Sequence, residues 1–221
     1  MSNAAFESKW DRSKQLETSF PTWCARVAAA LGGSLAAPRD PEQRNGWRDI
    51  RLPDGLTFCL SLVGDENRVS VGGDWPKDSK GQRVTPREAL SYNTEAAKIY
   101  VGAERDPKAA AKDIARRFLP TYREQYAACL ERVASRNAYQ DKVTANTRRV
   151  AAILGVSPDD KHGFRVNDGS GQVIAYGHAL CFRGVTVTGD NARFELDLPI
   201  DQAEQVLRIL KELAPEETEV A

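Results

Sequence analysis

The chain has 221 residues, 41% of them hydrophobic, and it carries 31 basic and 31 acidic side chains. This length and apolar content suffice for a buried core, as one large domain or two small ones, and no apolar run approaches the roughly 20 residues of a membrane span. The N-terminal stretch MSNAAFESKWDRSK lacks the apolar centre of a secretory signal, so we expect a cytoplasmic protein without membrane attachment.

Charge is distributed unevenly along the chain. Residues 1–104 hold 14 basic and 14 acidic side chains, residues 105–149 hold 11 and 5, and residues 150–221 hold 6 and 12. The middle is therefore basic and the end acidic, which bears on partners and self-association and not on the fold.

The cysteines and histidines favour neither disulfides nor a metal site. Four cysteines, Cys24, Cys59, Cys129 and Cys181, lie far apart without a C-x-x-C pair, a pattern typical of buried free thiols. The two histidines form no H-x-x-x-H pair. We expect reduced cysteines, no metal and no cofactor.

The first predicted element in chain order is a helix over residues 20–32. Ser19 suits the N-terminal cap and Pro21 the first turn, and apolar side chains then recur every four residues up to a Gly-Gly pair. Alternating apolar residues at 47–52, 56–63 and 68–73 predict an antiparallel meander with turns at PDG and GDEN.

A short helix and a long helix are predicted next. Thr85 and Glu88 form a capping box for the short helix, and residues 98–102 read as a fourth strand. The long helix covers residues 106–154, opened by Asp106, and Pro120 must kink or divide it. Its centre is polar, so we expect its two ends to be buried in separate lobes.

The remaining sequence predicts a second lobe. Strand patterns occupy residues 164–199, and Asp201 with Glu204 makes a capping box for a helix over 201–213. Its apolar residues Val206, Ile209, Leu210 and Leu213 are expected to face inward.

The predicted fold class is α+β, with two lobes that each contain an antiparallel sheet and flanking helices, joined by a long kinked central helix. The predicted segments are an N-terminal lobe at 1–105, a basic helical segment at 106–154, a C-terminal lobe at 155–214 and an acidic tail at 215–221.

Two similar stretches raise the question of an internal duplication. ARVAAALGGS at 25–34 and RRVAAILGVS at 148–157 match at an offset of 123 residues, which also pairs Pro76 with Pro199. The alternative is that RVAAxLG is a common way for an alanine-rich helix to end at a glycine.

The sequence presents no recognisable catalytic arrangement. His178 and Cys181 are three residues apart on a predicted strand, where alternation sends their side chains to opposite faces. The Gly-Ser-Gly at 169–171 lacks the strand-to-helix setting of a nucleophile elbow. We therefore expect that the protein is not an enzyme; the alternative is an active site assembled from distant residues.

The basic middle provides the candidate binding residues, because helical periodicity places several cations on one side where a phosphate backbone could lie. This strip comprises Arg105, Lys108, Lys112, Arg116, Arg117, Arg123, Arg132 and Arg136. A second group combines an aromatic ring suited to base stacking with nearby cations, and it comprises Trp75, Lys77, Lys80 and Arg83. The alternatives are a solvated helix face for the strip, which Asp113, Glu124 and Glu131 interrupt, and a core position for Trp75.

Two resemblances bear on function. The order helix, three antiparallel strands, helix resembles a double-stranded-RNA-binding domain, and KAAAKDIARRFL at 108–119 is similar to its lysine-bearing second helix. The paired-lysine loop of that family is absent, replaced by GAERDP, so its binding residues are not carried over. The stretch RDPKAAAKDIARRFLPTY resembles uncharacterised proteins of bacterial phages and plasmids, which implies a mobile-element setting.

The functional prediction is therefore a non-catalytic binder of nucleic acid or of a nucleic-acid-handling host complex, for which a counter-defence inhibitor is one version. The alternative is a protein assembly factor, in which the basic middle of one chain meets the acidic end of another copy or partner. An enzyme with an unrecognised site is the third hypothesis.

Overall fold

A computed structural model describes residues 3–37, 46–63, 67–153, 156–157, 164–167, 170–173, 181–198 and 200–213, and these residues have an α+β fold, as predicted. The chain divides into two compact units, Met1–Ala134 (unit 1) and Ser135–Ala221 (unit 2), and the division falls inside the longest helix. Among the described residues, no helix is long and apolar enough to cross a membrane.

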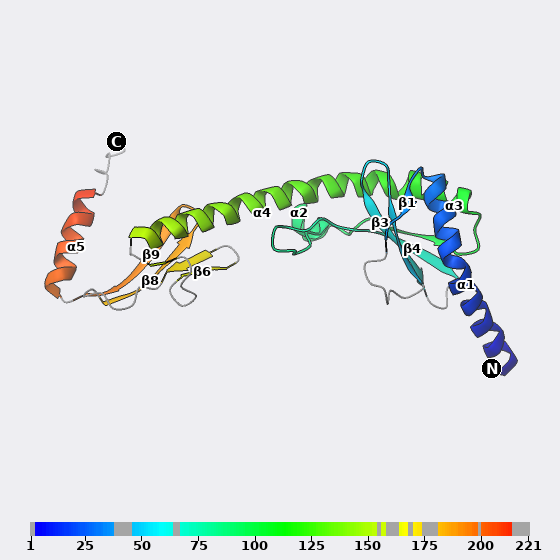
Figure 1. The fold of residues 1–221 in the computed structure, drawn as a ribbon, viewed down its shortest axis with the longest axis horizontal. Helices are drawn as coiled ribbons and strands as arrows, with labels where there is room; N and C mark the ends of the chain where they lie inside the picture. Colours follow the sequence, from blue (N-terminus) through cyan, green and yellow to red (C-terminus); the bar gives the residue numbers. More distant parts are fainter. Residues whose placement is uncertain are drawn as a thin grey trace. The chain divides into compact units, whose positions relative to one another are not determined.

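Unit 1 contains a five-stranded antiparallel sheet whose strands follow one another in chain order (Figure 1). They are β1 (Ser34–Leu35), β2 (Trp47–Arg51), β3 (Thr57–Val63), β4 (Arg68–Gly73) and β5 (Lys98–Gly102). The three strands predicted from alternation and the fourth predicted at residues 98–102 are confirmed. The edge strand β1 escaped prediction because two residues beside a proline-bearing polar segment show no alternation.

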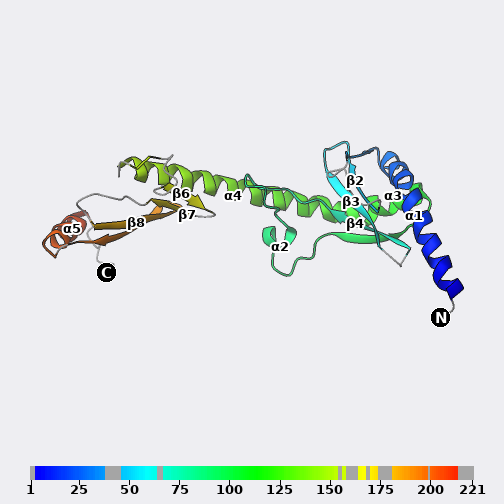
Figure 2. The same cartoon turned by 60° about the horizontal axis from the view of Figure 1, so that its bottom comes forward.

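Helices cover one face of this sheet (Figures 1 and 2). They are α1 (Asn3–Ala30), α3 (Pro107–Asp113), the π-turn η2 (Ile114–Phe118) and the first part of α4 (Leu119–Ile153). The short helix α2 (Pro86–Ala89) lies away from the sheet, beside α4. Alternate strand residues, among them Ile50, Phe58 and Val71, are fully buried against Val27 of α1 and Ile114 of η2. Burial of this single apolar face is the main stabilising contribution in unit 1.

The helix starts illustrate which local signals are reliable. The Asp106 carboxylate accepts a hydrogen bond from the Ala109 N–H at 3.0 Å, and the Thr85–Glu88 capping box is present, so both predicted starts are confirmed. The predicted cap at Ser19 is wrong, because α1 begins at Asn3 and the Ser19 hydroxyl donates to the Leu16 carbonyl inside the helix.

Pro120 neither ends nor divides the long helix, which runs without interruption from Pro107 to Ile153. A proline lacks the N–H that would bond four residues back, and its ring crowds that carbonyl. The chain widens into the π-turn just before it, where the Leu119 N–H donates to the Ile114 carbonyl five residues earlier. We attribute the accommodation of Pro120 to this wider turn.

Tyr122 of α4 fastens the helix to the ends of β3 and β4. Its Oη lies 2.5 Å from the Thr57 carbonyl oxygen and 2.8 Å from the Asp74 carbonyl oxygen, and its single proton can be donated to one of them at a time. The same Oη accepts a hydrogen bond from the Asp74 N–H at 3.0 Å. Burial raises the pKa of Tyr122, so it stays protonated. Its ring stacks on Phe118 with centroids 4.9 Å apart.

Unit 2 contains a four-stranded antiparallel sheet in chain order, which confirms the sheet predicted for residues 164–199. Its strands are β6 (Phe164–Asn167), β7 (Ser170–Val173), β8 (Cys181–Thr188) and β9 (Asn191–Asp197), followed by helix α5 (Ile200–Leu213). The part of α4 within this unit packs beside the β8–β9 turn, where the Asn146 side-chain amide donates to the Gly189 carbonyl at 2.8 Å.

The prediction that the apolar residues of α5 face inward is wrong for Ile209 and Leu210, whereas Val206 is half-buried. Ile209 and Leu210 are 57% and 56% exposed, and Leu207 is 64% exposed. The residues of α4 after Ser135 already adjoin the apolar residues of β8, since Val150 and Val187 line one hollow. Three apolar residues of α5, Leu207, Ile209 and Leu210, therefore stay exposed.

The buried thiols predict a loss of stability at alkaline pH. Burial raises the pKa of Cys24 from the ordinary 9.0 to about 12 and that of Cys129 to about 11. The folded chain holds these protons more tightly than the unfolded chain, so the stabilisation is complete below pH 9.0 and disappears as the pH rises through the folded values. Each thiol then costs about 1.4 kcal/mol per pH unit.

Cys24→Ala tests this directly. The decline in unfolding free energy from about pH 9.5 to about pH 10.5 should be shallower than in the wild type by about 1.4 kcal/mol, measured by urea unfolding. Because the cavity left by Cys24→Ala lowers the unfolding free energy equally at every pH, it does not affect the comparison of the two pH slopes. Equal slopes in the two proteins would contradict the assignment.

Candidate functional site

The turn between β5 and α3 presents cations on the surface of unit 1. Asp106 caps α3 and Pro107 occupies its first position, while Ala110 and Ala111 turn toward the core. The opposite side of the helix therefore faces solvent, and the predicted residues Lys108 and Lys112 are exposed there.

Asp113 organises two neighbouring arginines. Its side chain is 12% exposed, and the carboxylate lies 2.9 Å from Arg105 Nη1 and 3.6 Å from Arg116 Nη2. One negative charge thus holds two positive charges. Lys108, Lys112 and Arg117 have no ion pair among the described residues. We call this set the α3 basic surface, which comprises Arg105, Lys108, Lys112, Arg116 and Arg117.

The remainder of the predicted strip does not extend this surface. Arg123 pairs with Asp54 of the β2–β3 turn at 2.8 Å, so its charge is offset. The π-turn inserts one residue and shifts later positions by about 100° around the helix axis. Arg132 is exposed farther along α4, and exposed Glu124 and Glu131 interrupt the positive charge between and beside these arginines.

Trp75 is not the exposed stacking platform that its basic neighbours suggested. Its side chain is 7% exposed and meets the Tyr122 ring edge-on, with centroids 5.1 Å apart. The core position, which the sequence left as the alternative, is the one observed. A tryptophan at the end of an apolar strand finds its partners in the helix layer below it.

The basic residues that follow Trp75 lie on an ordered loop. Asp78 accepts the backbone N–H groups of Lys80 and Gln82 at 3.0 and 2.8 Å, and Lys77 forms an isolated bridge with Arg83. The Lys77, Lys80 and Arg83 side chains are exposed, and Arg83 reaches Asp74 at 3.4 Å. Both views place α2, which follows this loop, away from α3, so the two basic groups are not brought together (Figures 1 and 2).

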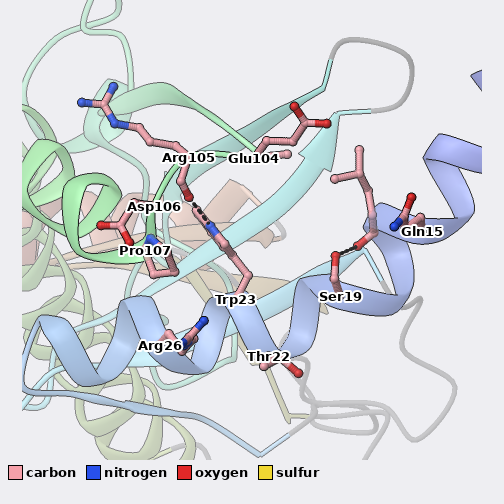
Figure 3. Close-up of a pocket in the computed structure, with 11 residues that line it drawn as sticks. Gln15, Ser19, Thr22, Trp23, Arg26, Glu104, Arg105, Asp106 and Pro107 are labelled. Carbon is pink, nitrogen blue, oxygen red and sulfur yellow. Dashed lines mark hydrogen bonds between the residues drawn. The ribbon is translucent and has the colours of Figure 1, made fainter.

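An open hollow of about 620 Å³ lies beside the α3 basic surface, between α1 and the β5–α3 turn (Figure 3). The Trp23 indole N–H donates to the Arg105 carbonyl at 2.8 Å, and the Arg105 side chain points away from the hollow. Arg26 adds an exposed cation, whereas Glu104 and Asp106 add carboxylates. Sequence reasoning missed Trp23 and Arg26 as neighbours of this turn because α1 and α3 are distant in the chain.

The described residues contain no group of three or more His, Cys, Asp or Glu side chains placed to hold a metal ion. His162 and His178 lie outside the described residues. The thiols of Cys24 and Cys129 stay protonated because burial raises the pKa of each, so neither is an activated nucleophile. Burial likewise raises the pKa of Tyr126.

Comparison of the chain with models of protein families, with curated proteins and with solved structures found no match.

Proposed function

We propose that unit 1 binds nucleic acid, or a complex that handles nucleic acid, through the α3 basic surface, and that the protein acts by binding and not by catalysis. The observation that carries this proposal is the exposure of Lys108, Lys112 and Arg117 without a carboxylate partner among the described residues. Cations fixed along a helix neutralise phosphates irrespective of base sequence and release counterions. The cytoplasmic location, the mobile-element setting and the inhibitor role expected from the sequence belong to this proposal.

The proposal includes a duplicated architecture of two lobes. Strands β4 and β9 begin at Arg68 and Asn191. Their starts have the offset of 123 residues that aligns ARVAAALGGS with RRVAAILGVS, which supports a common origin for the two helix-and-meander segments.

The salt dependence of binding tests the proposed function. Affinity for labelled duplex or single-stranded DNA and RNA should fall as salt rises, with a logarithmic slope of about 0.9 per neutralised phosphate on duplex and about 0.7 on single strands. Fluorescence anisotropy of the full chain at several salt concentrations measures this slope. Absence of binding to every probe at low salt would overturn direct contact with nucleic acid and leave a protein partner in a nucleic-acid-handling complex as the better account.

An assembly factor is the second candidate, favoured by the exposed apolar residues of α5. Ile200 is 77% and Leu207 64% exposed, and their spacing of seven residues places them on one side of the helix, where exposed apolar side chains can contact a partner protein. Light scattering across the same salt series distinguishes the candidates. A molecular mass that falls with salt, without binding of any nucleic acid, would favour assembly through the basic middle and the acidic end.

A further inference from the structure

The face of the unit 1 sheet opposite the hydrophobic core carries a row of four directly paired residues. The register pairs Trp47 with Ser61, Ser61 with Ser70, and Ser70 with Tyr100, so one row crosses β2, β3, β4 and β5. Directly paired residues point to the same side of a sheet. Trp47 and Tyr100 are 41% and 44% exposed, whereas the serines between them are half-buried.

The neighbouring row of paired residues has small residues at its centre, between the strands that carry Trp47 and Tyr100. It pairs Asp49 with Cys59, Cys59 with Gly72, and Gly72 with Lys98. Gly72 has no side chain, and the Cys59 thiol lies against the Gly72 carbonyl at 3.2 Å. Two aromatic side chains therefore flank a shallow trough of small residues, about 14 Å apart across three strand spacings.

The trough offers aromatic rings in defined positions. The Trp47 indole N–H donates to Asp49 Oδ1 at 3.1 Å, which orients the ring, and the residue is 41% exposed. Asp49 is 4% exposed, so its carboxylate is occupied beneath the surface and not presented to a ligand. The Lys98 ammonium lies 5.0 Å from the centre of the Tyr100 ring.

The exposed charge along the trough is mainly positive. Arg51 lies two residues after Asp49 in β2, on the same face of the sheet. Arg51, Lys77 and Asp49 together line a hollow of about 580 Å³. Arg51, Lys77 and Lys98 are exposed. The other carboxylate at the hollow, Asp74, is tied to Arg83 at 3.4 Å.

We propose that this sheet face binds single-stranded nucleic acid, with bases stacked on Trp47 and Tyr100 and phosphates directed to Arg51, Lys98 and Lys77. Unpaired bases present the flat π-faces that exposed aromatic rings stack on, and the cations complement the phosphate charge. A duplex hides those faces. The inference rests on nucleic acid as the ligand of the proposed function but uses a surface distinct from the α3 basic surface.

Aromatic substitutions test the inference in the full chain. Trp47→Ala and Tyr100→Ala should each lower affinity for a labelled oligothymidylate of about 15 nucleotides by about tenfold, and Trp47→Phe and Tyr100→Phe should retain most of it. Affinity for a duplex of equal length should change less than twofold, or about 0.4 kcal/mol, because the duplex bases stay stacked. Anisotropy measures both, and circular dichroism checks that each variant is folded.

A matched pair in the trough floor gives a second test that does not alter the aromatic residues. Ser70→Glu places a carboxylate between the two rings and should abolish measurable single-strand binding, whereas Ser70→Lys, of similar length, should preserve or strengthen it. Both side chains fit a half-open strand position.

Three outcomes separate this inference from the proposed function. In the first outcome, the double variant Trp47→Ala with Tyr100→Ala still binds single strands, but charge reversal of the α3 basic surface abolishes binding. This result overturns the inference and leaves the proposed function standing. In the second outcome, replacing the aromatic residues abolishes single-strand binding, whereas reversing the charges of the α3 basic surface does not change it. This result supports the inference and contradicts a nucleic-acid contact at the α3 basic surface. Binding of an uncharged oligosaccharide in place of oligothymidylate, without salt dependence, overturns the inference.

Discussion

Gly73→Ala is expected to lower the thermal midpoint of unfolding by about 10 °C, since it costs about 3 kcal/mol of folding free energy. A Cβ at this position would lie 2.4 Å from Tyr122 Cε2 and 2.7 Å from Trp75 Cζ2. The Tyr122 ring cannot withdraw without breaking its hydrogen bonds to the ends of β3 and β4. Calorimetry or thermal circular dichroism measures the shift.

The adjacent glycine provides the control for this prediction. A Cβ at Gly72 would meet only the Cys59 sulfur, at 3.5 Å, an ordinary contact on the other face of the same strand. Gly72→Ala should therefore change the midpoint by no more than about 2 °C. Combining Gly73→Ala with Tyr122→Ala should cost less than the sum of the two single changes, because the clash disappears with the ring. A Gly73→Ala protein as stable as the Gly72→Ala protein would contradict the proposed fit of Tyr122.

Local patterns were sufficient to predict most elements of the fold. Alternation identified β2, β3 and β4, and polar caps identified α2 and α3, because these signals depend on neighbours a few residues apart. The start of α1 was missed because Ser19 followed by Pro21 imitates a helix start, whereas the helix continues through both residues. The chain can continue there because a carbonyl that loses its partner to a proline on an exposed turn can bond to water.

The candidate sites needed information that a local pattern does not contain. Trp75 was selected because cations follow it, yet its side chain joins the core, and only the packing of α4 decides that. Trp47 and Tyr100 were overlooked because strand register, not sequence spacing, places them in one row. Helical spacing did predict the exposure of Lys108 and Lys112, but not that Asp113 would bind two arginines and Asp54 a third.

Reversal of Lys108, Lys112 and Arg117 to glutamate is expected to reduce nucleic-acid affinity by about 100-fold at low salt and to lower the logarithmic salt slope on duplex by about 3. These three side chains are exposed and hold no ion pair among the described residues, so their reversal leaves no buried carboxylate without a partner. Reversal of Arg105 or Arg116 would instead place a new acid beside the nearly buried Asp113, and reversal of Arg123 would place one beside Asp54. Anisotropy with labelled duplex and single strands gives both quantities.

A second triple variant with the same net charge distinguishes a specific effect of the α3 basic surface from an effect of the net charge of the chain. Reversal of Arg148, Arg149 and Arg208, which are exposed in unit 2, changes the charge of the chain by the same amount and should weaken binding by less than about threefold through long-range repulsion alone. Thermal unfolding should be nearly unchanged in both triple variants, because surface substitutions of this kind usually stay within about 0.5 kcal/mol each. Equal losses in the two variants would mean that overall charge and not the α3 basic surface governs binding. Unchanged affinity in the first variant, with the salt slope intact, would place the phosphate contacts elsewhere in the chain, and the exposed cations beside Trp47 and Tyr100 would then be the next to reverse.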